Sequence, residues 1–322
     1  MEVRSAELGV RSDAHWVFYS AFSATHHGGS ADLFGGRNPQ SAFGMSYYTV
    51  LGLTKEPFST SPDPAFFFRS SSHVQALTRL EIAIRLRRGL SLILGDVGTG
   101  KTTLARTLLA SFPQGEGFAF HMILDPSFET EYQFLLRLSR LFGLEGGFKS
   151  TLDTREAIEH HLFQRGVTQG QTTVLMIDEG QKLSLDMLEH LRVLLNYETN
   201  EFKLLQVVLF AQTELLGRIR RIKNFVDRVA LKYIINPLSE PETAQMIQFR
   251  LEAAGLPAGE TLFSPEAVQA IHEFTRGHLR QITLLCHNAL ETLVANDTRL
   301  VDGPMIEELI RDESRWICEP VA

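Results

Sequence analysis

The clearest chemical signal in the sequence is a glycine-rich segment that ends in a lysine and a hydroxyl group. Residues 95–102 read Gly-Asp-Val-Gly-Thr-Gly-Lys-Thr, which matches Gly-x-x-x-x-Gly-Lys-Ser/Thr at every fixed position. The glycines let backbone N–H groups turn inward around phosphates, Lys101 can bridge the β- and γ-phosphates, and Thr102 can hold Mg²⁺. The segment therefore predicts a phosphate-binding loop for a nucleoside triphosphate, with these contact residues: Gly95, Asp96, Val97, Gly98, Thr99, Gly100, Lys101, Thr102 and Thr103.

Two adjacent carboxylates form the second candidate site. Asp178 and Glu179 directly follow the apolar residues 174–177. A buried strand ending there would place both at the sheet edge beside the glycine-rich loop, where Asp178 can support Mg²⁺. Glu179 can polarise an attacking water as a general base. With Lys101 intact as well, the pair favours a triphosphate hydrolase over a switch that only binds nucleotide.

The elements that must position these residues are short apolar strands separated by helical patterns. Such alternation predicts a parallel α/β sheet with both faces covered. Gln212 would lie at the tip of the fourth strand, within reach of a γ-phosphate or the attacking water. Asp153-x-x-Glu156 predicts a capping box that opens one of the helices. The expected strands are residues 90–94, 118–124, 173–177, 204–210 and 230–235.

Only helical periodicity follows Pro237. Ser239 and Glu242 form a capping box with a proline between them. The pattern predicts a small all-helical second domain, with helices at residues 244–254, 265–275, 279–295 and 304–313. We therefore expect a nucleotide-binding domain at 45–236, a helical lid at 237–316 and a tail at 317–322.

Residues 1–44 differ from the rest of the sequence. They are rich in Ser, Gly, Ala and His, lack periodicity, and contain no apolar run long enough for a secretory signal. We expect a disordered leader, and we expect Met45 to be the true start of the protein. N-terminal sequencing of the native protein tests this expectation.

Composition excludes several classes of protein. Hydrophobic residues make up 44%, charged residues 21%, and only two cysteines are present. A disulfide scaffold, a zinc ribbon and a transmembrane segment are excluded. The net charge of −7 argues mildly against coating nucleic acid by bulk charge. The cysteine usage fits a reducing compartment.

From residue 45 to about residue 316, the sequence resembles the AAA+ ATPase domain of the general secretion pathway protein A family (ExeA/GspA), including pilus-biogenesis members of the MshM type. The resemblance implies a P-loop αβα sandwich with a five-stranded parallel sheet and a helical lid. It implies an ATPase that uses ATP and Mg²⁺ and helps envelope machinery assemble at the bacterial inner membrane. The blocks that carry it are residues 52–58, 61–64, 95–103, 177–181, 188–199, 210–215, 237–239 and 277–286.

The same resemblance implies roles for three further polar residues. Gln212 takes the sensor 1 position, and Arg280 takes the sensor 2 position at the start of a lid helix. Arg228, just before the fifth strand, would reach the nucleotide of a neighbouring subunit in a ring or filament, with Arg220 and Arg221 as rivals. The rest of the basic cluster, Arg218 and Lys223, is expected to be a solvated helix face.

The sequence departs from the long secretion members, which carry a transmembrane segment and a periplasmic peptidoglycan-binding domain after the ATPase. We therefore expect a cytoplasmic protein, attached to the inner membrane through a membrane-bound secretion or pilus partner. An alternative is a DNA-binding transposition regulator of the TniB/TnsC/MuB type, in which the cluster at 218–228 would face DNA. The acidic composition and the absence of a basic tail argue against that alternative.

Overall fold

A five-stranded parallel sheet forms the centre of the first half of the protein. The computed structural model describes residues 46–60, 64–113 and 117–318. The strand order is β2-β3-β4-β1-β5, and every pair is parallel. The predicted fold is confirmed, and each strand lies within two residues of its expected bounds: β1 (Leu90–Leu94), β2 (Phe118–Ile123), β3 (Thr172–Ile177), β4 (Leu205–Ala211) and β5 (Val229–Ile234).

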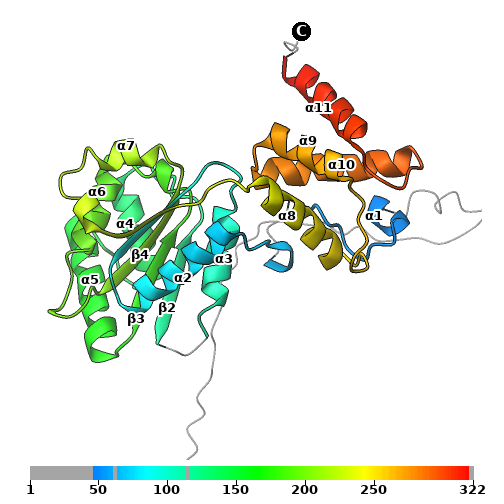
Figure 1. Ribbon diagram of the computed structural model, residues 1–322. Coiled ribbons are helices and arrows are strands. Elements are labelled where there is room, and N and C mark those ends of the chain that lie inside the picture. Colours follow the sequence, from blue (N-terminus) through cyan, green and yellow to red (C-terminus); the bar gives the residue numbers. More distant parts are fainter. Residues whose placement is uncertain (1–45, 61–63, 114–116, 319–322) are drawn as a thin grey trace, which may run out of the picture. The chain divides into compact units, whose positions relative to one another are not determined.

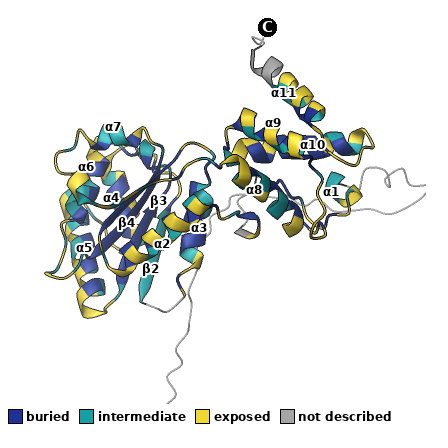
Figure 2. Cartoon of the chain, viewed as in Figure 1, coloured by how far each residue is buried: buried dark blue, intermediate teal, exposed yellow. Residues whose placement is uncertain are grey.

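The central strands bury both of their faces, which explains their continuous apolar runs. On β1, Leu92 and Leu94 pack toward one helical layer while Ile93 packs toward the other. Figure 2 shows β3 and β4 buried and the outer faces of the helices exposed. Because strand side chains alternate between faces, one apolar run supplies both cores.

Helices cover the two faces of the sheet, as Figure 1 shows. One layer packs around Leu80 and Leu104 and contains α2 (Ser71–Arg85) and α3 (Lys101–Ala110). The other packs around Phe134 and Leu188 and contains α4 (Glu131–Leu141), α5 (Thr151–Phe163), α6 (Leu185–Leu194) and α7 (Leu215–Ile219). The αβα arrangement places the loop between β1 and α3 at the carboxyl edge of the sheet.

The second half is helical. Its core includes Met246, Ile271 and Leu290 and belongs to α8 (Glu240–Ala253), α9 (Pro265–Thr275), α10 (Leu279–Ala295) and α11 (Gly303–Cys318). Ser239 and Glu242 form the expected capping box at the start of α8.

The segment before the sheet joins the helical core. Leu53 and Phe58 are buried with the side chains of α8 to α10, and Thr54 donates its N–H to the carbonyl of Ala254 at 2.8 Å. The short helix α1 (Tyr47–Val50) begins this segment. The domain limits at 45–236 and 237–316 remain a proposal. Residues 46–60 belong to the first domain by these limits, but they pack with the lid.

Two sequence expectations need comment. Ser150, rather than Asp153, caps α5, and its side chain accepts the N–H of Asp153 at 3.1 Å. The predicted leader at 1–44 and residues 319–322 of the predicted tail lie outside the described residues. Among the described residues, no helix is long and apolar enough to cross a bilayer.

Candidate active site

The predicted phosphate-binding loop, residues 95–103, follows β1 and runs into the first turn of α3. Gly98 and Gly100 have φ values of +79° and +87°, which side chains rarely adopt. Gly98 also faces the helical half, because a Cβ there would lie 2.7 Å from the Cβ of Arg280. The glycines thus give the loop both its curvature and its close contact with α10.

Lys101 is held inside this loop. Its Nζ donates to the carbonyls of Gly95 at 2.9 Å and Asp96 at 2.8 Å, and the residue is 7% exposed. Burial lowers the pKa of Lys101, although the nearby Asp178, Glu179 and Asp96 favour its charged form. A buried ammonium among these oxygens fits the binding of an anionic phosphate chain.

Two oxygen groups that could bind a metal ion lie together beside the start of α3. Thr102 Oγ1 donates to Asp178 Oδ2 at 2.5 Å, and Asp178 is 2% exposed. Asp178 Oδ1 accepts the Glu179 N–H at 2.9 Å, which fixes the carboxylate. A hydroxyl beside a carboxylate is a hard oxygen pair of the kind Mg²⁺ prefers alongside substrate phosphates. These residues therefore fit the implied metal.

Glu179 belongs to a polar network across two strand ends. Its backbone is left-handed, with φ +51°. Gln181 Nε2 donates to Glu179 Oε2 at 2.7 Å, and Gln181 Oε1 accepts the Gln212 N–H at 3.1 Å. The candidate base and the candidate sensor are thus linked through one glutamine side chain, to which the sequence analysis gave no role.

Arg218 does not lie on a solvated helix face, contrary to the sequence expectation. Its guanidinium donates to the carbonyls of Gln181 and Leu183. Arg218 therefore anchors the loop that follows Glu179. Arg220, Arg221 and Lys223 are exposed, and they lie in the turns that follow α7 rather than on a helix face.

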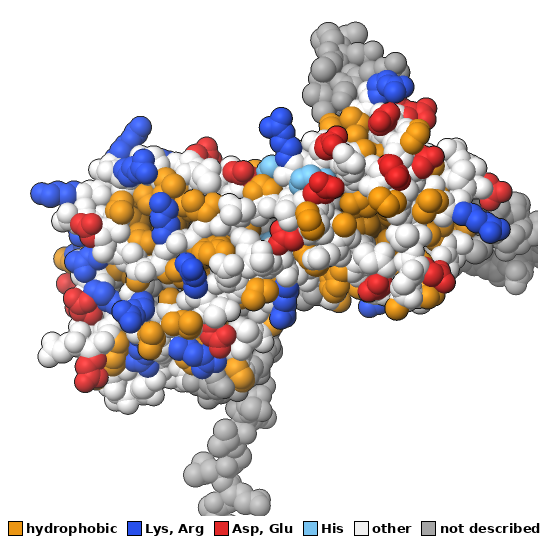
Figure 3. Space-filling model, in the orientation of Figure 1, with side chains coloured by type: hydrophobic (Ala, Val, Ile, Leu, Met, Phe, Trp, Pro, Cys, Tyr) orange, Lys and Arg blue, Asp and Glu red, His pale blue; other side chains and the backbone are white. Residues whose placement is uncertain are grey.

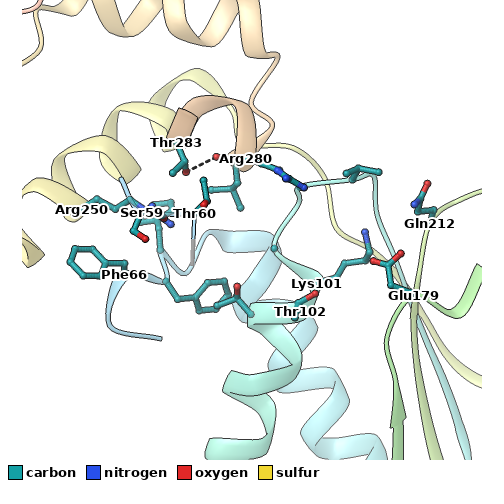
Figure 4. Close-up of a pocket in the computed structure, with 17 residues that line it drawn as sticks. Ser59, Thr60, Phe66, Lys101, Thr102, Glu179, Gln212, Arg250, Arg280 and Thr283 are labelled. Atoms are coloured by element: carbon teal, nitrogen blue, oxygen red, sulfur yellow. Dashed lines mark hydrogen bonds between the residues drawn. The ribbon is translucent and has the colours of Figure 1, made fainter. Parts of the chain in front are cut away.

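One cavity of about 550 Å³ brings most of these residues together. Figure 4 shows Lys101, Thr102, Glu179 and Gln212 on one side of it and Arg280 and Thr283 on the other. Val97, Gly98, Gly100 and Thr103 also line it. Gly95, Asp96, Thr99 and Asp178 do not line the cavity. Gly95, Asp96 and Asp178 bind the lining residues Lys101 or Thr102, and Thr99 is bonded in the chain to Gly98 and Gly100.

The sequence analysis missed part of this lining. Ser59, Thr60, Arg250 and Thr283 come from the N-terminal segment and the helical half. The phenylalanines at 66–68 also line the cavity, and Phe66 and Phe67 are buried. Only Thr283 carried a usable signal, because it lies one helical turn after Arg280.

The start of α10 contacts the loop directly. The Arg280 N–H donates to the Gly98 carbonyl at 3.3 Å, and His278 Nε2 lies 3.7 Å from Asp96 Oδ2. Arg280 is the second residue of α10, and its backbone lies beside the loop.

Arg228 lies at the other edge of the sheet. It ends the turn Val226–Arg228 and precedes β5, whose first residue pairs with Leu90 at the start of β1. The loop leaves the far end of β1, after Leu94. Arg228 is not among the residues that line the cavity.

Comparison with known proteins identifies relatives of this chain. A family model described as an AAA domain matches residues 84–219. The general secretion pathway protein A of Aeromonas hydrophila is 36% identical over 282 residues, which cover 84% of this chain and 50% of that protein. The chain thus spans about half the length of this curated relative.

Solved structures share the fold. The ORC2 protein of Aeropyrum pernix superposes with a TM-score of 0.59 at 18% identity, covering 81% of this chain and 72% of that one. Cdc6p from Pyrobaculum aerophilum gives a TM-score of 0.60 at 17% identity, covering 77% and 69%. Identities this low show the fold alone. By its AAA domain and by its sequence, the chain belongs to the general secretion pathway protein A family of AAA ATPases.

Proposed function

We propose that the protein binds ATP with Mg²⁺ and hydrolyses it to ADP and phosphate. The observation that carries this proposal is the single cavity where Lys101, Thr102, Glu179, Gln212 and Arg280 meet. Each of these side chains suits a different part of a triphosphate undergoing attack by water.

In this proposal the chain's own residues position the reactants. When the nucleotide binds, the Lys101 ammonium leaves the carbonyls of Gly95 and Asp96 and donates to phosphate oxygens instead. Backbone N–H groups of the loop donate to the same phosphates. Glu179 accepts a proton from the attacking water, and Gln212 orients that water or the γ-phosphate. Thr102 and Asp178 would hold Mg²⁺, which neutralises charge on the phosphates when bound.

The energy is proposed to serve the assembly of a secretion or pilus system. The supporting observation is the 36% identity to general secretion pathway protein A. We infer self-association with nucleotide between subunits, a cytoplasmic location, and attachment to the inner membrane through a membrane-bound partner. DNA is not the favoured partner, because the net charge is −7. On the face shown in Figure 3, Lys and Arg side chains lie mostly over the sheet half, with acidic and apolar side chains among them.

The test measures ATP turnover of wild type, Glu179→Gln and Lys101→Ala, with and without duplex DNA, at about 150 mM salt, where weak charge-driven binding is partly screened. We expect Lys101→Ala to lose nucleotide binding. Glu179→Gln should bind ADP as wild type does but lose roughly 100-fold or more in turnover, the range for removing a general base.

Two outcomes would change the proposal. Wild-type turnover in Glu179→Gln would remove that residue as the base. Strong stimulation by DNA would replace the secretion role with the transposition-type role and make residues 218–228 the surface to mutate. Turnover that ignores DNA supports the secretion role.

A further inference from the structure

A buried histidine contacts the phosphate-binding loop from outside the cavity. His73, the third residue of α2, has no exposed surface. Its Nδ1 lies 2.7 Å from Ser70 Oγ, and its Nε2 lies 2.9 Å from the carbonyl oxygen of Thr99. One imidazole therefore joins the start of α2 to the centre of the loop.

The hydrogen-bonding groups decide which nitrogen carries the proton. A carbonyl oxygen can only accept, so Nε2 donates to Thr99. Nδ1 then accepts from the Ser70 hydroxyl, whose oxygen also accepts the His73 N–H as the cap of α2. Burial lowers the pKa of His73, against the opposing effects of Thr99 and Glu242, which favours the neutral ring.

This contact fixes the direction of one peptide plane. In a trans peptide the C=O of one residue and the N–H of the next point in opposite directions. Because the Thr99 carbonyl points at His73, the Gly100 N–H points away from it. Gly100 lines the cavity, and in the described part of the chain no carbonyl is recorded as accepting its N–H.

Without the hydrogen bond from His73, the peptide group between Thr99 and Gly100 is free to rotate. Gly100 has φ +87°, and glycine permits the rotations that reverse a peptide plane. Thr99 is already fixed on its other side, since its Oγ1 donates to the Asp96 carbonyl at 2.9 Å. Phe67 packs edge-on against the imidazole, with ring centroids 5.1 Å apart, and separates it from the cavity.

We propose that His73 is a positioning residue for phosphate binding: by holding the Thr99 carbonyl, it aims the Gly100 N–H at the phosphates of the nucleotide. This inference rests on the proposed nucleotide-binding function. It extends the site to a residue that is not among those lining the cavity.

The test compares His73→Gln, His73→Asn and His73→Leu in the full-length chain. A Gln side chain can place its amide nitrogen near the position of Nε2, whereas Asn reaches only the position of Nδ1, and Leu cannot donate. Calorimetric titration with ADP should show binding weakened about tenfold in the Leu and Asn variants, as expected for one lost hydrogen bond to the loop, and less than about threefold in the Gln variant.

Adenosine separates positioning from general damage, because it has no phosphates. Its affinity, measured by competition, should be the same in wild type and all three variants. The thermal midpoint without nucleotide reports on folding, and the Gln–Asn comparison remains informative if the Leu variant does not fold. His272→Leu is the matched control, because this histidine also contacts a hydroxyl, on Thr243, but does not touch the loop.

Each outcome is decisive. If wild type binds ADP and His73→Leu binds it equally well, the inference is wrong and the proposed function stands. If adenosine binding falls as much as ADP binding, or if Asn rescues as well as Gln, His73 has only a structural role. If wild type itself fails to bind ADP, the proposed function fails and the inference fails with it.

Discussion

At Gly98 the phosphate-binding loop and the first turn of α10 approach so closely that no side chain fits between them. An added Cβ would lie 2.7 Å from the Cβ of Arg280, and φ is +79°. Gly98→Ala must therefore strain the loop or push α10 away. We expect ADP binding to weaken at least tenfold, measured by titration, because Arg280 moves with α10 and Lys101 with the loop.

A second glycine provides the control for this prediction. Gly147 has open space around its Cβ position and no left-handed backbone. Gly147→Ala should keep wild-type ADP affinity and thermal midpoint. Equal ADP affinity in Gly98→Ala and wild type would show that the close approach to α10 has no effect on binding.

The site residues that sequence could locate are those whose signal is local. Lys101 and Thr102 belong to one continuous motif, and Asp178 and Glu179 end one apolar run. His73 and Arg218 were missed or misassigned because their partners are distant in sequence: the contacts span 26 residues from His73 to Thr99 and 37 from Arg218 to Gln181. Nothing in a sequence pattern indicates which carbonyl a buried donor will meet.

Among the elements, the strands were the most predictable. A strand buried on both faces is a short apolar run, and β1 shows no ambiguity. The sequence analysis gave no bounds for the five-residue helix α7, because it is too short to show a helical period. At α5, Asp153 and Ser150 are both acceptable caps by type, and only the backbone path of the structure separates them.

The packing of residues 46–60 against the helical core also could not be predicted from the sequence. Leu53 and Phe58 show that this segment is apolar, but apolarity does not say which of two cores it joins. The contact of Thr54 with Ala254 spans 200 residues. Such long-range choices depend on the complementary surfaces of both halves.

The edge strand β2 makes the stability of the fold depend on pH. The pKa of His121 is lowered to about 4, first by burial and then by repulsion from His161 and Arg165, while a hydrogen bond with the Leu141 backbone opposes the shift. The neutral ring packs edge-on against Phe142, with centroids 4.9 Å apart. Protonation of His121 is therefore unfavourable in the folded state, whereas in the unfolded state nothing opposes it.

The sign of the pH effect follows from this difference. Above the unfolded pKa of about 6.5 neither state is protonated, and the folded state has its full stability. As pH falls from about 6.5 to about 4, only the unfolded state gains the proton, so stability is lost. Between pH 7.5 and pH 5 we expect wild type to lose about 2 kcal/mol more unfolding free energy than His121→Gln, measured by urea denaturation.

His160→Gln is the control for this pH effect. His160 lies on α5 beside His161 but is exposed. The variant should lose stability with falling pH as wild type does. If His121→Gln loses as much stability as wild type over the same range, another group is responsible.

For the whole molecule, the position of Arg228 separates it from its own nucleotide site. It precedes β5 at the start of the strands, whereas the loop follows their ends, and five residues of β1 span about 15 Å. Arg228 also contributes to lowering the pKa of Glu198, after the larger effect of the hydrogen bond from Lys203, and Glu198 precedes β4 at the same edge. If Arg228 acts in hydrolysis, it acts on a second copy.

Mixing two inactive variants tests this arrangement directly. Arg228→Ala keeps Glu179 but cannot complete a neighbour's site, and Glu179→Gln keeps Arg228 but has no base. Each alone should turn over ATP poorly, while a mixture should recover part of the wild-type rate, because the Glu179→Gln copy supplies its arginine to the site of the Arg228→Ala copy.

Wild-type turnover per subunit should rise with protein concentration, and that of Arg228→Ala should stay flat. Recovery with Arg220→Ala or Arg221→Ala, but not with Arg228→Ala, would transfer the role to that arginine. A concentration-independent wild-type rate with no recovery in any mixture would mean that each subunit hydrolyses ATP with its own residues alone.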